Sequence, residues 1–392
     1  MDSLCLVRPL ASAIYGRVLL VRHRSSGRHY ALKVMSLPHM HARRAVTGPY
    51  VQEDGDMELQ ILRKLGRNLV YSSGSRDNLS NSWSVSPVWS NGVGDDTRAA
   101  TGGQLGDQHL LTLHQDFVDW TTKTRCLLFD YCPYGDLFSQ VSETRGGLPL
   151  ETARTCFQQI SSAVLFLHGR NVAHRDLSLE NVLLDSFRRC RLADFGLASA
   201  AGSHCSGPRV GKILYMAPEV FTRPLYRPEG DVNAETSTEA CYNGLQADIW
   251  SLGVVLFILV TGIPPFEKAN EVDARFRLVS KPGGSVRALL HAWGQEDRLP
   301  RELQDLLDWM LRVDPRQRPT AEQICQHQWL QPASGKRKSV KESGQREKRP
   351  SVDEPEAEED GENLEPQKMA SRSDKSWSWS TLRSNKRVKR TG

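Results

Sequence analysis

The chain has 392 residues, a formal net charge of +5 and a hydrophobic fraction of 39%, so it is long enough for one large two-lobed domain or two smaller ones. The mild positive charge does not indicate a nucleic-acid-binding protein. The eight cysteines occur singly, without a C-x-x-C pair, which argues against a zinc site or a disulfide framework.

Two features of the chain bear on its compartment. The longest apolar run, residues 249–260, is interrupted by Ser251 and Gly253 and falls short of the ~20 residues that a membrane span needs, so a buried helix is predicted. The first ten residues lack the basic region, apolar core and cleavage site of a secretory signal. We therefore expect an intracellular protein without a membrane span, cytoplasmic or also nuclear.

The first 65 residues are predicted to form a small sheet followed by a helix. Strand patterns cover residues 4–9, 16–23 and 30–35, and Ser25-Ser26-Gly27 is a turn signal between the last two. After Met57 the apolar residues recur with helical spacing. An antiparallel sheet with one helix follows from this pattern.

Regular structure resumes further along the chain and becomes mainly helical. Strands are predicted over residues 110–118 and 125–131, and an amphipathic helix over residues 153–168 ends at Gly169. Because the strands come first and the helices later, the predicted fold class is α+β.

Three polar segments are predicted to lie outside the regular structure. Residues from about 66 to 108 and from about 223 to 244 lack periodicity and are predicted to be insertions. From residue 331 to residue 392 hydrophobic residues nearly vanish, so a disordered charged tail is predicted. The remaining chain divides into a small lobe, residues 1–132, and a larger lobe, residues 133–330.

The tail carries charge clusters of both signs. Basic clusters at residues 336–338, 348–349 and 386–390 flank an acidic run over residues 353–365. Such clusters can bind an importin, an acidic partner or the protein's own larger lobe, and a solvated tail without a partner is the alternative.

Several short motifs that carry chemistry occur in order along the chain. They are Ala31-Leu32-Lys33, His174-Arg175-Asp176-Leu177-Ser178-Leu179-Glu180-Asn181, Asp194-Phe195-Gly196, Ala217-Pro218-Glu219 and Asp248-Ile249-Trp250-Ser251-Leu252-Gly253. In these motifs the chain closely resembles the eukaryotic protein kinase family, from about residue 4 to residue 330 outside the insertions. The sequences around residues 248–266 and 314–330 are most similar to calmodulin-dependent or AMP-activated-like serine/threonine kinases. The resemblance implies the two-lobed kinase fold.

The resemblance also implies a reaction, the transfer of the γ-phosphate of Mg-ATP to serine or threonine hydroxyls of protein substrates. It implies that Asp176 accepts the hydroxyl proton and that Asn181 and Asp194 hold Mg²⁺, for which their oxygens are suitable ligands. Lys33 would contact the phosphates and pair with Glu58. The implied nucleotide site comprises Ala11, Ala13, Gly16, Val18, Ala31, Lys33, Asp130, Cys132, Asn181 and Asp194.

Two carboxylates compete for Lys33. Glu58 leads the predicted helix, whereas Glu53 precedes a break at Asp54-Gly55-Asp56 and is the weaker choice. Glu58 is therefore the expected partner.

Other positions are expected to stabilise the fold rather than to react. By resemblance, Glu219 pairs with Arg318, and Asp248 holds the backbone of the loop around Asp176. Residues 314–330 are expected to form a final helix.

The phosphate-covering loop departs from the family pattern G-x-G-x-x-G-x-V. The aligned residues are Ala11-Ser12-Ala13-Ile14-Tyr15-Gly16-Arg17-Val18, so alanine replaces two of three glycines. A Cβ at these positions hinders unusual backbone angles and close approach to phosphate. We expect weakened rather than abolished ATP binding.

The catalytic loop departs from the pattern as well. Serine/threonine kinases usually carry a lysine two residues after the aspartate, where this chain has Ser178, and that lysine normally neutralises charge on the transferring phosphate. Gly211-Lys212 stands where such kinases usually have Gly-Thr, and both positions approach the catalytic aspartate in the family fold. We hypothesise a swap in which Lys212 supplies the cation and Ser178 takes the place of the hydroxyl. The alternative is a solvent-facing Lys212.

Activation by an upstream kinase is a further hypothesis. Arg175 can receive a phosphate from a serine between the Asp194-Phe195-Gly196 and Ala217-Pro218-Glu219 motifs, and Ser206 is preferred. The serines available there are Ser199, Ser203 and Ser206.

Two other functions compete with a serine/threonine kinase. The altered glycine loop and Ser178 favour a pseudokinase scaffold, but Lys33, Asp176, Asn181 and Asp194 are all present. A tyrosine-specific kinase finds no support in the catalytic loop, which lacks the A-A-R or R-A-A sequence of those enzymes.

Overall fold

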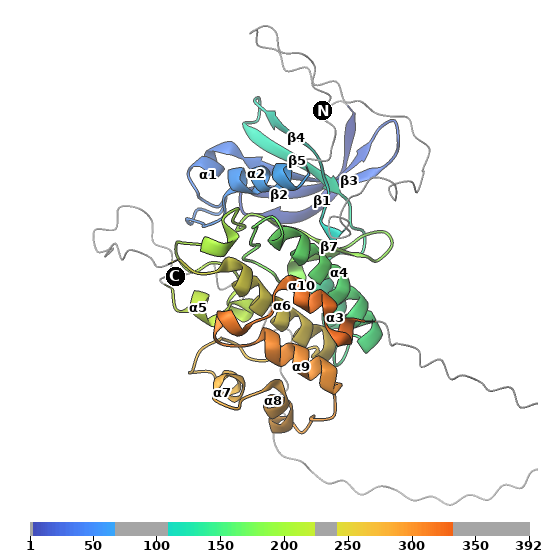
Figure 1. Cartoon of the computed structure of the whole chain (residues 1–392). Helices are drawn as coiled ribbons and strands as arrows, with labels where there is room; N and C mark the ends of the chain where they lie inside the picture. The colour runs from blue at the N-terminus through green and yellow to red at the C-terminus, as the bar shows by residue number, and fades with distance from the viewer. Residues whose placement is uncertain (1–2, 67–108, 224–240, 332–392) are drawn as a thin grey trace, which may run out of the picture. The chain divides into compact units, whose positions relative to one another are not determined.

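The computed structural model describes residues 3–66, 109–223 and 241–331, and these form a β-rich N-lobe and a mainly helical C-lobe (Figure 1). The α+β, two-lobed fold class is confirmed. Nearly all of the first predicted insertion, most of the second and the tail lie outside the described residues. The strands are β1 (Leu4–Ala13), β2 (Gly16–His23), β3 (His29–Ser36), β4 (Leu113–Asp119), β5 (Thr124–Asp130), β6 (Val182–Leu184) and β7 (Cys190–Leu192), and the helices are α1 (Leu37–His41), α2 (Gly55–Leu65), α3 (Leu137–Glu143), α4 (Leu150–His168), α5 (Pro218–Phe221), α6 (Gly244–Thr261), α7 (Ala274–Ser280), α8 (Val286–Ala292), α9 (Arg301–Met310) and α10 (Ala321–Gln326).

The N-lobe contains an antiparallel five-stranded sheet in the order β1-β2-β3-β5-β4. Gly27 has a φ of +68° in the β2–β3 turn, a conformation that glycine adopts readily, so the predicted turn is present. The β2–β3 and β3–β5 registers place Lys33 between Val18 and Leu127. Lys33 therefore lies on a central strand of the sheet.

Strand β4 begins at Leu113, later than the predicted start at Leu110. Leu110 forms a parallel bridge with Leu192, and the Leu111 N–H donates to the Leu192 carbonyl at 2.9 Å. The chain joins β7 there before it enters the N-lobe sheet, which is why the predicted boundary is wrong.

Helix α2 begins at the residues that the sequence suggested as a break. The Asp54 side chain accepts hydrogen bonds from the N–H groups of Asp56 and Met57, which is the usual function of an N-cap aspartate. Acidic residues in the first turn and basic residues in the last turn of α2 complement the helix dipole. The supposed break is therefore the helix start, and Glu58 lies in the first turn.

Helix α6 forms the centre of the C-lobe. It includes the long apolar run, and 15 of its 18 residues are buried. Length and composition alone would allow α6 to cross a membrane, yet 83% of the helix is buried inside the protein. The prediction of a buried core helix is therefore confirmed. Gly244, which we placed at the end of the second insertion, is the first residue of α6.

The segment 314–330 is not the single final helix that we predicted. It consists of α10 between two 3₁₀ turns, Pro315–Gln317 and Gln328–Leu330. Pro319 lacks the N–H needed to continue a helix from the first turn, and Thr320 and Gln323 form a capping box that starts α10 anew.

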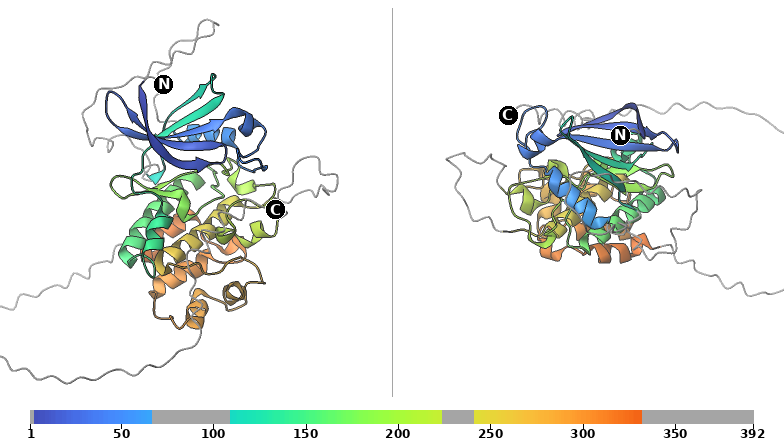
Figure 2. Two further views of the ribbon diagram at one scale, coloured as in Figure 1. Left: turned by 180° about the vertical axis from the view of Figure 1, so that it is seen from behind. Right: turned by 90° about the horizontal axis from the view of Figure 1, so that it is seen from above.

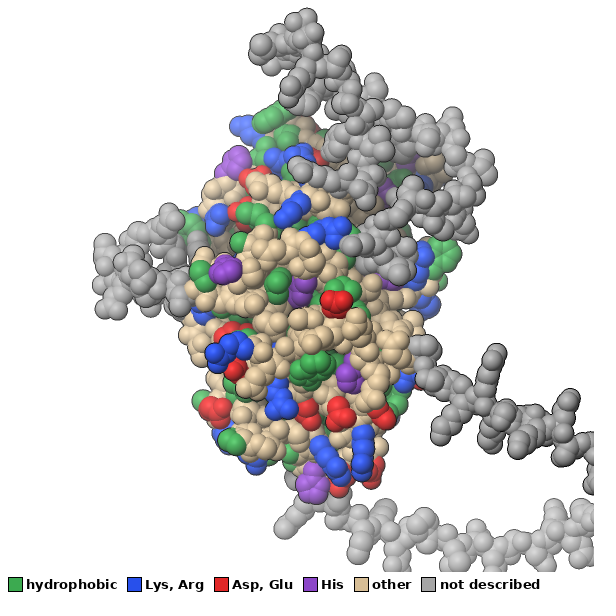
Figure 3. Space-filling view, in the orientation of Figure 1, with side chains coloured by type: hydrophobic (Ala, Val, Ile, Leu, Met, Phe, Trp, Pro, Cys, Tyr) green, Lys and Arg blue, Asp and Glu red, His purple; other side chains and the backbone are tan. Residues whose placement is uncertain are grey.

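The view from behind in Figure 2 shows the same division into sheet and helices. On the face drawn in Figure 3, Lys and Arg side chains are interspersed with Asp and Glu side chains over the C-lobe helices. This face presents both signs of charge close together.

Candidate active site

The hairpin β6–β7 brings Asn181 and Asp194 to the same place. Val182 pairs with Leu192, and the Ala193 N–H donates to the Asn181 carbonyl at 2.8 Å. Asn181 directly precedes β6 and Asp194 follows β7 by two residues, so the pairing sets both at one end of the hairpin. Two oxygen-bearing side chains that are separated in sequence thus come together.

Lys33 joins the N-lobe sheet to this hairpin. Its Nζ donates to both carboxylate oxygens of Glu58, at 2.7 and 2.8 Å, and lies 3.7 Å from Asp194 Oδ1. Burial opposes the charged form of Lys33, but the two carboxylates outweigh it and hold the pKa of this lysine above its ordinary value. The structure thus places the predicted partner, Glu58, against Lys33.

Glu53, the rival of Glu58, lies beside Asp194 instead. The N–H of the next residue, Asp54, donates to the Gly196 carbonyl at 2.9 Å, and the Glu53 Cγ is 3.4 Å from where a Cβ on Gly196 would lie. Within the described residues Glu53 forms no ion pair. Burial, with the negative charge of Asp194 as a second cause, raises the pKa of Glu53 from 4.5 to about 7.

The raised pKa of Glu53 predicts a pH-dependent stability of the nucleotide-free protein. Between pH 4.5 and about pH 7 the folded protein keeps a proton on the Glu53 carboxyl group, whereas the unfolded chain releases it. The unfolding free energy therefore falls as the pH rises, by at most about 1.4 kcal/mol per pH unit. Glu53→Gln removes this loss, so in denaturant titrations it is expected to be more stable than wild type at about pH 8, with the difference shrinking towards about pH 5. An equal difference at both pH values would contradict the assignment.

The catalytic loop, residues 174–181, is fixed to the C-lobe core by Asp248. This residue lies in α6 and is buried. Its carboxylate accepts the backbone N–H groups of His174 and Arg175 at 2.7 and 2.8 Å. The predicted contact between Asp248 and the loop backbone is present, and it holds Asp176 at a defined position.

Three groups surround the Asp176 carboxylate. Asn181 Nδ2 donates to Asp176 Oδ2 at 2.9 Å and to its carbonyl at 2.7 Å. Lys212 Nζ donates to Oδ2 at 2.6 Å, and the Lys212 N–H donates to Oδ1 at 3.2 Å. Oδ2 is therefore occupied twice, and Oδ1 has only the longer contact. Oδ1 is therefore the oxygen that is better placed to accept a hydrogen bond from a further donor.

Lys212 reaches into the site from the activation segment, residues 196–217. Its Nζ also donates to Ser178 Oγ at 3.0 Å. Burial disfavours the charge, but Asp176 and Glu180 outweigh it and raise the pKa of Lys212. The solvent-facing alternative does not describe this side chain, because it bridges Asp176 and Ser178.

Gly211 lets the two segments approach each other. It has a φ of +92°, and a Cβ there would lie 2.6 Å from the Arg175 carbonyl oxygen. Only glycine fits such a close approach at positive φ. The glycine before Lys212 is thus required for the lysine to reach Asp176.

The lid, residues 11–18, is an ordinary β-hairpin. Ala11 pairs with Val18 and Ala13 with Gly16, and neither alanine has a positive φ. The lid therefore has no positive φ at these alanines, as expected for residues that carry a Cβ, and a weakened ATP affinity stays a prediction. Gly16 is necessary, because a Cβ there would lie 2.1 Å from the Val34 carbonyl oxygen.

Hydrogen bonds hold the tip of the lid against the segment before α2. The buried Tyr15 hydroxyl donates to the Glu53 carbonyl, and the Val46 N–H donates to the Ile14 carbonyl at 2.9 Å. Burial is the main cause that raises the pKa of Tyr15 to about 12. Sequence reasoning missed these contacts, since Tyr15 and Glu53 are 38 residues apart.

The remaining residues of the predicted nucleotide site lie at the end of the sheet. Ala31 pairs with Phe129, and Asp130 pairs with Tyr30. The Asp130 carboxylate accepts hydrogen bonds from Arg28 and His114 at 3.0 and 2.7 Å, so its side chain is already engaged. Burial is the first cause that raises the pKa of Cys132 to about 12, which keeps this thiol protonated at neutral pH.

The Asn181 and Asp194 side chains fit Mg²⁺ chemically. Asn181 donates through its Nδ2, which leaves the amide oxygen as an acceptor, and Lys33 and Lys212 outweigh burial to lower the pKa of Asp194. Within the described residues no group of three or more His, Cys, Asp or Glu is placed to hold a metal. Mg²⁺ commonly binds one or two carboxylates together with phosphates, so this donor pair suits a phosphate-bound ion.

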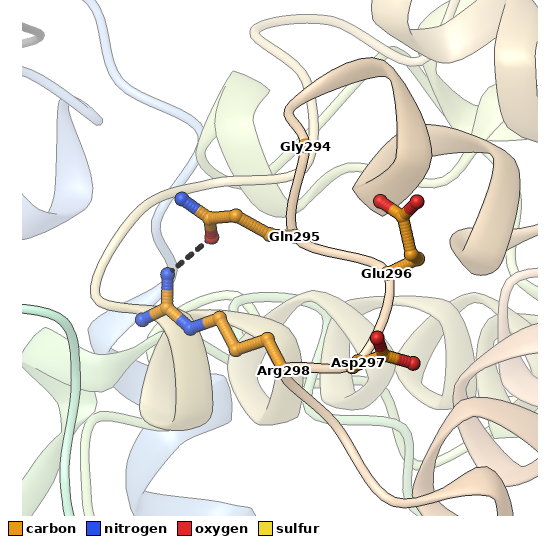
Figure 4. A pocket seen from close by; sticks show the side chains of 5 residues that line it. All are labelled: Gly294, Gln295, Glu296, Asp297 and Arg298. Atoms are coloured by element: carbon orange, nitrogen blue, oxygen red, sulfur yellow. Dashed lines mark hydrogen bonds between the residues drawn. The ribbon is translucent and has the colours of Figure 1, made fainter.

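A separate surface hollow lies in the loop between α8 and α9. Residues 294–298 line it (Figure 4). Arg298 donates to Gln295 Oε1 at 2.6 Å and to the carbonyls of Gly146 and Thr261 at 2.5 and 2.9 Å. This arginine therefore ties the loop to the C-lobe, and none of the residues discussed above lines the hollow.

Comparisons with known proteins show which proteins this chain is similar to. The family model described as the protein kinase domain matches residues 103–330. The chain is 29% identical to serine/threonine protein kinase OSK3 of Oryza sativa subsp. japonica over 325 residues, 83% of this chain and 49% of that protein. It is 29% identical to the carbon catabolite-derepressing protein kinase of Secale cereale over 323 residues, 82% and 50% of the two chains. It is 34% identical to NUAK family SNF1-like kinase 2 of Homo sapiens over 227 residues, 58% and 31% of the two chains. The chain thus spans about half the length of the plant relatives it matches.

Proposed function

Because the chain belongs to the protein kinase family, we propose that it transfers the γ-phosphate of Mg-ATP to serine or threonine hydroxyls of protein substrates. The relatives are named serine/threonine or SNF1-like kinases, which agrees with the predicted resemblance to AMP-activated-like kinases. The observation that carries the proposal is the contact of Asp176 with both Asn181 and Lys212.

In this proposal Asp176 accepts the proton of the substrate hydroxyl. Oδ2 is fixed by Asn181 and Lys212, so Oδ1 is the oxygen that faces the incoming hydroxyl. Asn181 and Asp194 would hold Mg²⁺, which would supply positive charge to the phosphates of the nucleotide. A carboxylate whose orientation is already set needs little rearrangement as the reaction proceeds.

Lys33 and Lys212 supply positive charge from two sides of the site. Glu58 holds the ammonium group of Lys33, which would contact the α- and β-phosphates of ATP. Lys212 would stabilise the charge on the transferring phosphoryl group, with Ser178 in the position of the usual hydroxyl. The proposal of a relocated cation is supported by its two contacts, because one ammonium group touches both the base and the serine.

The partners and compartment of this kinase are proposals from the sequence. Protein substrates follow from the protein kinase family, and an intracellular location is proposed from the sequence. Importin binding is proposed for the basic clusters at residues 336–338, 348–349 and 386–390, which lie outside the described residues, so it depends on the charge pattern of the tail alone. An upstream kinase that acts on Ser206 is a hypothesis from the sequence, and it competes with the contact between Arg175 and Tyr242 that is described below.

A radiolabelled ATP assay tests the proposed function. We expect wild type with Mg²⁺ to label generic protein substrates on serine and threonine, and Asp176→Asn to lose at least about 10²-fold in kcat because the proton acceptor is gone. Phosphoamino-acid analysis and intact-mass spectra complete the measurement. If wild type and Asp176→Asn label substrate equally weakly, the chain is a pseudokinase scaffold instead.

A further inference from the structure

Tyr242 lies at the end of the second polar segment and touches the catalytic loop. Its hydroxyl accepts a hydrogen bond from Arg175 Nε at 2.9 Å. The residue is only 8% exposed, and its backbone N–H and carbonyl both pair with Cys205, at 2.9 Å each. Tyr242 is therefore held against the activation segment while its side chain points to Arg175.

Arg175 occupies a position from which it influences Asp176. Its N–H is bound by Asp248 at 2.8 Å, it has a φ of +64°, and its carbonyl faces Gly211. Within the part of the chain that the structure describes, Arg175 forms no ion pair; its guanidinium meets a neutral hydroxyl, with Cζ 5.8 Å from the Tyr242 ring centre.

A second arginine links Tyr242 to the activation segment. Arg223 Cζ lies 5.1 Å from the centre of the Tyr242 ring, and its Nε donates to the Gly207 carbonyl at 2.7 Å. One tyrosine side chain thus connects the catalytic loop with residues next to Ser206. Guanidinium groups are attracted to the faces of aromatic rings, and a hydroxyl that accepts from a cation forms a stronger bond than a neutral pair does.

We propose that Tyr242 is a positioning residue for phosphoryl transfer. Its hydroxyl holds Arg175 in the role that the sequence suggests for a phosphoserine, so the catalytic loop is ordered while the activation segment is unmodified. This inference rests on the proposed kinase function. It is an alternative to the hypothesis that phosphorylation of Ser206 activates the enzyme, and it gives Tyr242, at the end of the second polar segment, a part in positioning the catalytic loop.

Two variants test the inference. Tyr242→Phe keeps the ring beside Arg223 and removes only the hydroxyl. We expect kcat to fall about tenfold with the KM for ATP unchanged, since a bond to a charged group is lost near the base and not near the nucleotide. Tyr50→Phe is the matched control: Tyr50 is exposed and faces Arg44 at 4.1 Å, outside the site, and is expected to keep wild-type kcat.

The second arm removes every hydroxyl of the activation segment that a serine/threonine kinase could modify. Ser199, Ser203 and Ser206 are the only serines or threonines between Gly196 and Ala217. The variant with all three changed to alanine, and wild type treated with phosphatase until its intact mass shows no phosphate, are both expected to keep wild-type kcat. This arm decides even if Tyr242→Phe fails to fold, which its melting temperature will show.

The outcomes separate the two proposals. The role of Tyr242 would be overturned if wild type transfers phosphate but loses this activity after phosphatase treatment or in the triple alanine variant. It would also be overturned if a folded Tyr242→Phe variant keeps the kcat of wild type. No transfer by wild type under any of these conditions would overturn the proposed kinase function, and the role of Tyr242 with it.

Discussion

In the Lys212→Thr variant, kcat is expected to fall by about 10²- to 10³-fold, the loss typical when a preorganised charge-stabilising donor is removed from an active site. Lys212 Nζ is the cation that touches both Asp176 and Ser178. Threonine cannot extend a charge to that point. Steady-state kinetics with saturating ATP measures the effect, and circular dichroism checks the fold.

The companion variant Ser178→Lys is expected not to raise kcat. Ser178 is buried and already bonded to Lys212, so a second ammonium group would be placed against the first one. Two like charges at this distance disfavour each other. An intact kcat in Lys212→Thr would refute the relocated cation outright.

The Arg318→Met variant is expected to lower the unfolding free energy by up to about 3 to 5 kcal/mol, the loss seen when a buried ion pair is broken, because it leaves the partly buried Glu219 carboxylate unpaired. The Arg318 side chain is 0% exposed. It donates to both carboxylate oxygens of Glu219, at 2.7 and 2.8 Å, and to the carbonyls of Arg312, Gln246 and Val313. Three carbonyls and one carboxylate would lose their donor together.

Arg316→Met provides the matched control for this stability measurement. Arg316 is two residues away and also bonds a carboxylate, that of Asp314, but its side chain is 88% exposed. Exposed ion pairs contribute little to stability because water screens them, so denaturant titration should show a small change. Equal losses in the two variants would contradict the role assigned to the buried Arg318–Glu219 pair.

The sequence was sufficient to predict the elements and contacts that follow from a local pattern of residues. Helical spacing after Met57 placed Glu58 on α2, and the N-cap at Asp54 starts this helix so that Glu58 reaches Lys33 at 2.7 Å. The strand patterns and the turn at Gly27 were enough to predict the β1–β2–β3 sheet. The hypothesis about Lys212 came from two substitutions in separate motifs, and the structure places that side chain against Asp176 and Ser178.

What the sequence could not predict depends on contacts between distant segments. The Tyr242 hydroxyl meets Arg175 across 67 residues, and no local pattern distinguishes that tyrosine from others. Leu110 leaves the predicted strand because it pairs with Leu192. Periodicity describes one segment at a time, whereas these outcomes are decided by the partner segment.

The central claim, that the catalytic cation has moved from the loop of Asp176 to Lys212, is tested most directly by the double variant Lys212→Thr/Ser178→Lys. The measurement is kcat for peptide phosphorylation beside wild type and Lys212→Thr. We expect the double variant to recover to within about tenfold of wild type, because a lysine at position 178 returns positive charge to the transferring phosphate. A folded double variant whose kcat stays at the level of Lys212→Thr would contradict the claim.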